Sequence, residues 1–247
     1  MDGSMQARRR RRTGWLFFGV LLAALVAVAM NWSTLAGWLS PAEAGTSGNT
    51  LMASSPQDVA AARAMLSALA VGQRPGSLIG YKRSAFGDAW TDTDANGCNQ
   101  RDDVLLRDVL KDRAYRVGRQ GGCDHDVLAG SWRDPYTGTV VTLTDAKAQG
   151  QLVQIDHIVP LSVAWRYGAS AWTDATRLQF ANDVEELLAV SASSNDDKGG
   201  SDASQWRPSL EAQCGYAARY VRVKSTYRLP TDHREKAALA AMLDTCG

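Results

Sequence analysis

The sequence predicts an α+β fold in a single domain of residues 56–247, and two patterns along the chain carry that prediction. Short β-branched and apolar runs between turn residues indicate strands, mostly in the first half of the domain. Apolar residues at helical spacing indicate helices, mostly in the second half. Strands are expected within 76–90 and 114–144 and at 152–156, and helices at 56–71, 102–110, 161–167, 173–181, 202–206, 209–226 and 231–244.

Capping and turn residues set several of these boundaries. Ser55 followed by Pro56 is typical of a helix start, with an N-cap residue and then proline at the first helical position. Residues 134–138 read Asp-Pro-Tyr-Thr-Gly, which predicts a turn between the strand-like runs 127–132 and 139–143.

Residues 1–44 have the composition of an export segment. Five consecutive arginines at 8–12 precede a stretch without charge. A cleaved signal peptide is one alternative, since 42–44 read Ala-Glu-Ala. The other is a retained anchor, because 15–39 would form a helix of roughly 37 Å, longer than a bilayer core of about 30 Å; this length slightly favours the anchor. Residues 45–55 are expected to be a linker, and the domain is expected to be extracellular or anchored to the outer face of the cell membrane.

The charge balance excludes a strongly basic nucleic-acid binder. The whole chain has 27 Lys+Arg and 26 Asp+Glu, but residues 45–247 alone carry a formal net charge of −2. A tight non-specific binder of nucleic acid has a broad basic surface. Contact with phosphate must therefore come from a local patch or from a bound cation.

The chain has four cysteines, all outside the export segment. An even number in an exported domain predicts two disulfides. Three pairings are possible, and the spacing favours Cys98–Cys123 with Cys214–Cys246. The sequence contains no CxxC pair, which makes a zinc site less favoured than disulfides.

The residues that indicate chemistry lie on an expected strand and in a downstream loop. The strand at 152–156 leads into Asp156-His157, and a second strand is expected within 181–190. It leads to a polar, glycine-ended loop at 194–200 that runs into a helix and contains Asn195 and Lys198. Histidine is a natural base near neutral pH, and carboxylate and amide oxygens suit a hard divalent cation. Adjacent strand residues point to opposite faces, so a single site would require a bend after Asp156.

This set resembles the HNH, or ββα-metal, nuclease motif. Further segments extend the resemblance to exported bacterial HNH proteins, whose HNH region is related to the C-terminal nuclease domain of GmrSD-type restriction enzymes. These segments are 90–98, 134–138, 180–183, 202–206 and the terminal Cys246. The resemblance covers roughly residues 60–247 and implies an HNH ββα core.

The resemblance also implies roles for the residues. His157 would be the general base, and Asp156 and Asn195 would hold a divalent metal ion, Mg²⁺ first, with Mn²⁺ or Zn²⁺ as alternatives. Lys198 would lie near the scissile phosphate or support its loop. Glu186 departs from the pattern, because the family usually has Asn nine residues before Asn195.

Glu186 is expected to orient the catalytic histidine by accepting a hydrogen bond from its ring, or else to join the metal or disable the site. The implied function is a metal-dependent endonuclease that hydrolyses phosphodiester bonds of DNA outside the cytoplasm. The alternative is a catalytically impaired HNH-fold module that binds nucleic acid or the cell envelope. A membrane contact is expected only through an uncleaved N-terminal segment, and no protein partner is evident.

Three further features stay open. Residues 92–103 have the Asp and Asn spacing of a calcium loop, with Asp103 in place of the usual final Glu; the alternative is an Asx-rich turn before a helix, and no entering helix is evident. Arg101 and Arg107 would contact nucleic acid or form a solvated face. The tryptophans are expected to anchor the core rather than to stack on bases; they are Trp90, Trp132, Trp165, Trp172 and Trp206.

Overall fold

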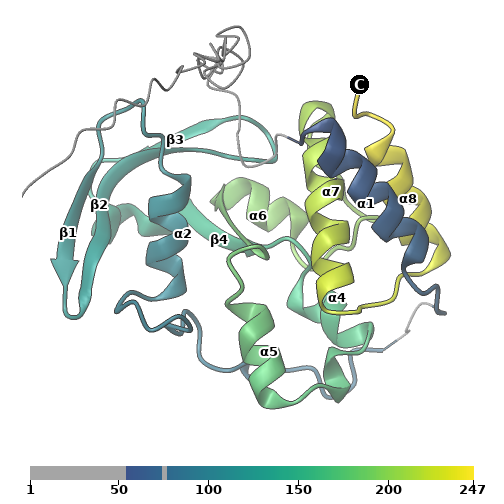
Figure 1. Cartoon of the computed structure of the whole chain (residues 1–247). Helices are drawn as coiled ribbons and strands as arrows, with labels where there is room; N and C mark the ends of the chain where they lie inside the picture. Colours follow the sequence, from purple (N-terminus) through teal and green to yellow (C-terminus); the bar gives the residue numbers. More distant parts are fainter. Residues whose placement is uncertain (1–53, 74–76) are drawn as a thin grey trace, which may run out of the picture. The chain divides into compact units, whose positions relative to one another are not determined.

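A computed structural model describes residues 54–73 and 77–247, which belong to one compact unit of helices and strands (Figure 1). The predicted α+β class is confirmed. Both alternatives for residues 1–44 lie outside the described residues, as does nearly all of the expected linker. Within the part that the structure describes, no helix is long and apolar enough to cross a bilayer.

The strands form two separate antiparallel sheets. Strands β1, β2 and β3 make a three-stranded sheet in that order, and β4 pairs with β5. The strands are β1 (Arg116–Gln120), β2 (Cys123–Arg133), β3 (Val140–Leu143), β4 (Val153–His157) and β5 (Leu187–Ser191). The helices are α1 (Pro56–Ala68), α2 (Gln100–Asp108), α3 (Ala146–Gln149), α4 (Leu161–Arg166), α5 (Asp174–Ala181), α6 (Ala192–Lys198), α7 (Leu210–Thr226) and α8 (His233–Leu243). Three short 3-10 helices are η3 (Arg83–Phe86), η4 (Gly150–Leu152) and η5 (Ala169–Ala171).

Strands β4 and β5 and helix α6 form a ββα unit. The strands pair with Val153 opposite Ser191 and His157 opposite Leu187. Helix α6 follows β5 directly. The last residue of β5, Ser191, caps the helix, because its side chain accepts a hydrogen bond from the Ser194 N–H. Helix α6 then packs against both strands. This order of elements is the one that the HNH resemblance implies.

Two apolar cores hold the unit together. Helices α1, α7 and α8 lie side by side (Figure 1) and share the larger core with α4 and α5. The smaller core lies between α2, β2, β4 and β5, where the Trp132 indole donates to the Leu105 carbonyl at 2.9 Å. Burial of these apolar faces supplies the main stabilising free energy.

The expected cysteine pairing is confirmed. Cys98–Cys123 connects the segment before α2 to β2, and Cys214–Cys246 connects α7 to the C-terminal end of the chain. Arg101 and Arg107, left open above, have internal partners. Arg101 donates to the carbonyls of Gly150 and Val153, and Arg107 binds Asp108 and two further backbone carbonyls.

Some expected elements were wrong or misplaced. The described residues 77–90 contain η3 and turns but no strand. Residues 203–205 form a turn instead of a helix, because the Asp202 side chain accepts from both the N–H and the hydroxyl of Ser204. The strand expected within 181–190 is shifted to β5, since α5 occupies its first residue. Asn195 lies inside α6 rather than in a loop before a helix.

We expect removal of the Cys214–Cys246 bond to destabilise the domain by about 3–4 kcal/mol. The bond joins residues 32 apart, and the value follows from the chain entropy that such a crosslink removes from the unfolded state. Urea unfolding of the Cys214→Ser/Cys246→Ser double variant measures it. The matched Cys98→Ser/Cys123→Ser pair, with a separation of 25, should lose nearly as much; a loss near zero would contradict the entropic account.

Candidate active site

The strand β4 sends its last two side chains in opposite directions. Adjacent strand residues point to opposite faces, and no bend separates Asp156 from His157, since both pair with β5. Asp156 lies toward α6, whereas His157 lies toward Ala181 and the Trp90 segment. The structure therefore divides the expected site residues into two groups.

The first group is built around the buried Asp156 carboxylate. The fully buried Lys198 Nζ lies 3.1 Å from Oδ1 and 2.9 Å from Oδ2 of Asp156. The Tyr136 hydroxyl donates to Oδ2 at 2.5 Å. Tyr136 lies in the predicted turn at 134–138. In the same turn, the Asp134 carboxylate accepts a hydrogen bond from the Ser191 N–H at 3.0 Å. The Asp156 carboxylate is therefore both neutralised and hydrogen-bonded by the protein itself.

Asn195, on α6, contacts the same face of β4 through Gln154. It lies one turn before Lys198 on α6, and its Nδ2 donates to Gln154 Oε1 at 2.6 Å. Gln154 and Asp156 are two residues apart on β4, so their side chains point to the same face of the strand. Asn195 and Lys198 thus touch neighbouring positions of one strand face, and the side-chain oxygen of Asn195 stays available as an acceptor.

His157 belongs to the second group and is held as a neutral base. Its Nε2 lies 3.0 Å from the Ala181 carbonyl oxygen, so Nε2 carries the proton and donates it. Burial lowers the pKa of His157 to about 3, and nearby Arg83 and Lys198 act in the same direction. The neutral ring leaves Nδ1 as an acceptor, but a pKa of about 3 makes it a weaker base than the near-neutral value at which general-base catalysis is most effective.

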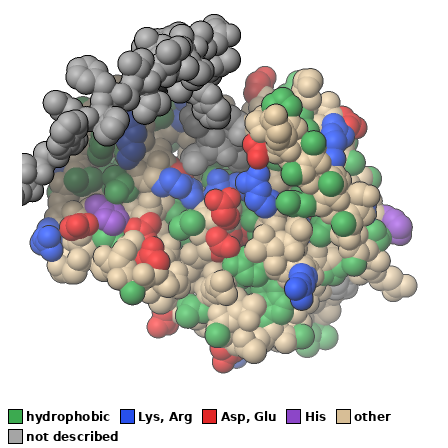
Figure 2. All heavy atoms as spheres, in the orientation of Figure 1, with side chains coloured by type: hydrophobic (Ala, Val, Ile, Leu, Met, Phe, Trp, Pro, Cys, Tyr) green, Lys and Arg blue, Asp and Glu red, His purple; other side chains and the backbone are tan. Residues whose placement is uncertain are grey.

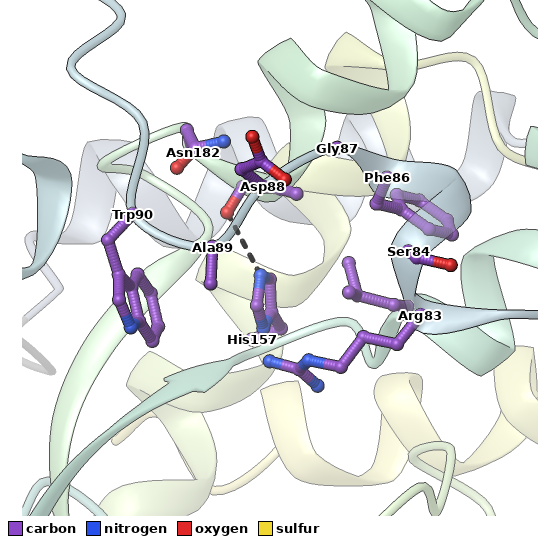
Figure 3. Close-up of a pocket in the computed structure, with 11 residues that line it drawn as sticks. Arg83, Ser84, Phe86, Gly87, Asp88, Ala89, Trp90, His157 and Asn182 are labelled. Atoms are coloured by element: carbon purple, nitrogen blue, oxygen red, sulfur yellow. Dashed lines mark hydrogen bonds between the residues drawn. The ribbon is translucent and has the colours of Figure 1, made fainter.

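The His157 ring faces a pocket of about 250 Å³ (Figure 3). Its lining also includes Arg83 from η3, Trp90 and Asn182. Figure 3 shows the Arg83 guanidinium beside the histidine ring, and among the described residues it makes no hydrogen bond or ion pair. An exposed cation next to a neutral base is suited to binding an anionic group.

Trp90 forms one wall of this pocket under backbone strain. Its ring lies 6.4 Å from the His157 ring, at an interplanar angle of 15°. Its φ of 60° is unfavourable for a bulky residue and indicates a conformation that the surroundings impose. Buried Asn182 contributes by accepting from the Thr91 N–H at 3.1 Å, while its own Nδ2 donates to the Leu178 carbonyl.

Contrary to the expectation, Glu186 does not contact the histidine ring. Both of its oxygens accept from the Val159 N–H, at 3.1 and 3.3 Å, and its own carbonyl accepts from the Ile158 N–H. Burial raises the pKa of Glu186 well above its usual range. The orienting partner of His157 is therefore the Ala181 carbonyl, and Glu186 supports the backbone turn that follows the histidine.

The donor chemistry of Asp156 and Asn195 fits a hard divalent cation. Both offer side-chain oxygens on the α6 side of β4, and Asn195 Oδ1 has no hydrogen-bond partner within the described residues. Lys198 already supplies a positive charge to Asp156, so ligation there would have to share that carboxylate. In the described part of the chain, the only cluster of three Cys, His or carboxylate ligand atoms is Cys98, Cys123 and His125, whose sulfurs form a disulfide.

Arg83 was not predicted as a site residue. Asn182 was expected only as a less favoured substitute for the missing Asn, and Trp90, expected in the core, packs against the smaller core and also lines the pocket. Arg83 precedes His157 by 74 residues and lies on a short 3-10 helix, so no local spacing connects them. Trp90 lies in segment 90–98, one of the segments that carry the family resemblance, and this position could have indicated a role at the site. Asn182 follows Ala181 directly, but the pairing of its side chain with the Thr91 backbone depends on the tertiary fold.

Comparison with known proteins identifies the class to which this fold and ββα unit belong. Residues 99–242 match the family of GmrSD restriction endonucleases, C-terminal domain. An uncharacterized secreted protein of Arthroderma benhamiae is 39% identical over 189 residues, which cover 75% of this chain and 84% of the relative. No solved structure matches. The chain belongs to the GmrSD C-terminal domain family, which is a nuclease-like family of HNH type.

The matches leave some expectations open. The relative is fungal, so the expected bacterial origin is unconfirmed. Its description as secreted, together with the two disulfides, fits an extracellular location. The family match begins at Asn99, so Arg83 and Trp90 lie outside it, whereas His157 and the ββα unit lie within it.

We expect His157 to make the domain less stable in acid. An unfolded histidine takes up a proton near pH 6.5, but the folded residue does so only near its pKa of about 3. As the pH falls from 6.5 toward 3, the unfolded state binds the extra proton, and the unfolding free energy decreases by up to about 1.4 kcal/mol per pH unit.

Urea unfolding between pH 7.5 and 5 measures this slope. The His157→Asn variant should show a shallower dependence on pH than the wild type. His233→Asn, which changes an exposed histidine on α8, is the matched control. Equal slopes for His157→Asn and the wild type would show that the buried ring does not resist protonation.

We expect Glu186→Gln to remain close to the wild type, because a neutral amide keeps the acceptor for the Val159 N–H. Glu186→Met should lose about 1–3 kcal/mol of stability, since that buried N–H would have no acceptor. Thermal unfolding of both variants measures the difference. A Gln variant as unstable as the Met variant would show that the charge of Glu186, rather than its acceptor, matters.

Proposed function

We propose that the chain is a metal-dependent endonuclease that hydrolyses phosphodiester bonds, with DNA as the substrate, outside the cytoplasm. The observation that carries this proposal is a neutral histidine that lines a pocket beside Arg83, where neither Nδ1 nor the guanidinium has a partner among the described residues. The family supports nuclease chemistry, and the secreted relative supports the location.

In the proposed reaction, His157 activates the attacking water. Nδ1 takes a proton from water as the water oxygen bonds to phosphorus, and the bond from phosphorus to the leaving sugar oxygen breaks. The leaving oxygen is protonated by solvent. Nε2 keeps its hydrogen bond to the Ala181 carbonyl throughout, which fixes the ring plane and stabilises the imidazolium that forms.

Arg83 is proposed to bind the phosphate. Its guanidinium lies beside the ring in Figure 3 and has no competing ion pair in the described residues. A guanidinium can donate two parallel hydrogen bonds to phosphate oxygens. Figure 2 shows acidic and basic side chains mixed across the visible face of the molecule, so a local contact of this kind matches the near-neutral charge of the chain.

Asp156 and Asn195 are the proposed ligands of the divalent cation, for which Mg²⁺ is the first candidate and Mn²⁺ or Zn²⁺ are alternatives. A divalent cation supplies positive charge to phosphate oxygens; because Asp156 and His157 lie on opposite faces of β4, a cation there would reach the phosphate beside His157 only if the end of the strand bends. Lys198 is proposed to hold Asp156 in place, since its Nζ contacts both that carboxylate and the His157 carbonyl, at 2.8 Å. Glu186 is proposed to act as a positioning residue through the Val159 backbone.

One observation favours the alternative function, a catalytically impaired module that binds nucleic acid or the cell envelope. Asp156 is committed to a buried ion pair with Lys198, and it lies on the opposite face of β4 from His157. If the carboxylate cannot share its charge with a cation, the fold remains intact but phosphodiester hydrolysis does not occur.

Nicking of supercoiled plasmid DNA in Mg²⁺, Mn²⁺ or Zn²⁺ tests the proposed function. We expect the wild type to nick, and His157→Ala to nick about 10²–10⁴-fold more slowly, the usual contribution of a general base. Arg83→Ala should lose roughly 10–100-fold, which corresponds to a hydrogen bond to a charged group. Arg113→Ala, at an exposed arginine outside the pocket, is the matched control.

Two results would contradict the proposal. An inert wild type in all three metals would leave the binding module as the function. If the wild type nicks DNA and the His157→Ala variant nicks it at the same rate, the base lies elsewhere.

A further inference from the structure

The loop of residues 92–103, before and into α2, gathers carboxylate oxygens around the side chain of Asn96. The Asn96 Nδ2 lies 3.1 Å from an oxygen of Asp94 and 3.1 Å from an oxygen of Asp103. The backbone N–H of Asn96 lies 3.2 Å from oxygens of both Asp92 and Asp94. Three carboxylates distributed along twelve residues thus turn toward one residue, Asp94 and Asp103 toward its side chain and Asp92 and Asp94 toward its backbone N–H.

Two buried oxygens of this loop have no hydrogen-bond donor. Asp103 Oδ2 is shielded from solvent and has no partner, although Oδ1 of the same group has two. Gln100 is 2% exposed and its Oε1 also has no partner, while its Nε2 is bonded to the Thr93 hydroxyl within the loop. Buried acceptors are nearly always satisfied, so these two oxygens indicate a missing electropositive partner.

Protein side chains neutralise little of this charge. His125 donates to Asp103 Oδ1 at 2.8 Å from one side. The Arg101 side chain within the loop is turned away and donates to the carbonyls of Gly150 and Val153.

We propose that residues 92–103 bind a calcium ion at a site distinct from the nuclease centre. The side-chain oxygens of Asp92, Asp94, Asn96 and Asp103 are the proposed ligands, and the Cys98 carbonyl adds a backbone oxygen at the seventh position of the loop. Asn96 joins them by a half-turn of its amide, which exchanges nitrogen for oxygen and gives up the bond that Oδ1 accepts from the Cys98 N–H at 2.7 Å. Its Oδ1 would then lie about 3 Å from two carboxylate oxygens, a separation suited to a shared Ca²⁺ shell.

A disulfide and a hydrogen bond to strand β2 hold the loop in place. Cys98 is bonded to Cys123 of β2, and His125 of the same strand holds Asp103. Trp90 lies two residues before Asp92, so calcium would also fix one end of the segment that forms the pocket wall. Oxygen ligands in this number favour Ca²⁺ over the smaller Mg²⁺, which retains more of its water.

Calorimetric titration of the chelator-treated, disulfide-bonded protein with CaCl₂ tests the site directly. We expect one Ca²⁺ per chain, with a Kd on the order of 10⁻⁴–10⁻³ M, as in extracellular modules. Calcium at ten times Kd should raise Tm by roughly 3–6 °C, and Mg²⁺ at the same concentration should raise it by much less. Neither readout depends on DNA cleavage, so the site and the nuclease proposal fail separately.

Two loop variants and one control make the test specific. Asp94→Asn and Asp103→Asn should each weaken Ca²⁺ binding at least tenfold, while Glu211→Gln, at an exposed carboxylate on α7, should not. Each variant is compared with its own calcium-free Tm, so a destabilised variant stays informative. A wild type without calcium-dependent heat or Tm shift, or a shift retained in both loop variants, would overturn the proposal.

Discussion

The buried ion pair between Lys198 and Asp156 is the interaction on which the arrangement of the site depends. One ammonium contacts the Asp156 carboxylate and also the His157 carbonyl at 2.8 Å, so α6 is joined to the last two residues of β4. The hydroxyl of Tyr136 joins the 134–138 turn to the same carboxylate. Breaking such a pair by removing one partner costs about 3–5 kcal/mol, because the other charge stays buried.

The ion pair also determines where His157 points. With Asp156 committed toward α6, strand alternation sends His157 to the other face of β4. There the Ala181 carbonyl fixes one ring nitrogen, and Glu186 holds the backbone of the next two residues. Backbone and side-chain partners thus surround the histidine, and the ring keeps one free nitrogen in a pocket walled by a strained Trp90.

The sequence predicted what depends on local chemistry. Ser55 and Pro56 begin α1 with a capping box, and the cysteines pair with their sequence neighbours. It also predicted the order strand, strand, helix around His157 and Asn195. It did not predict the partner of His157, because the Ala181 carbonyl carries no residue-type signal. Nor could it place Arg83 beside the ring, since that contact depends on how distant segments pack.

The ionisation and tautomer of His157 test this account most directly. Long-range ¹H–¹⁵N NMR of the ¹⁵N-histidine-labelled protein reports which ring nitrogen carries the proton. The account predicts a neutral ring with the proton on Nε2 and a bare Nδ1, unchanged from pH 8 down to 5. A ring that is doubly protonated near pH 6.5, or one that carries its proton on Nδ1, would contradict it.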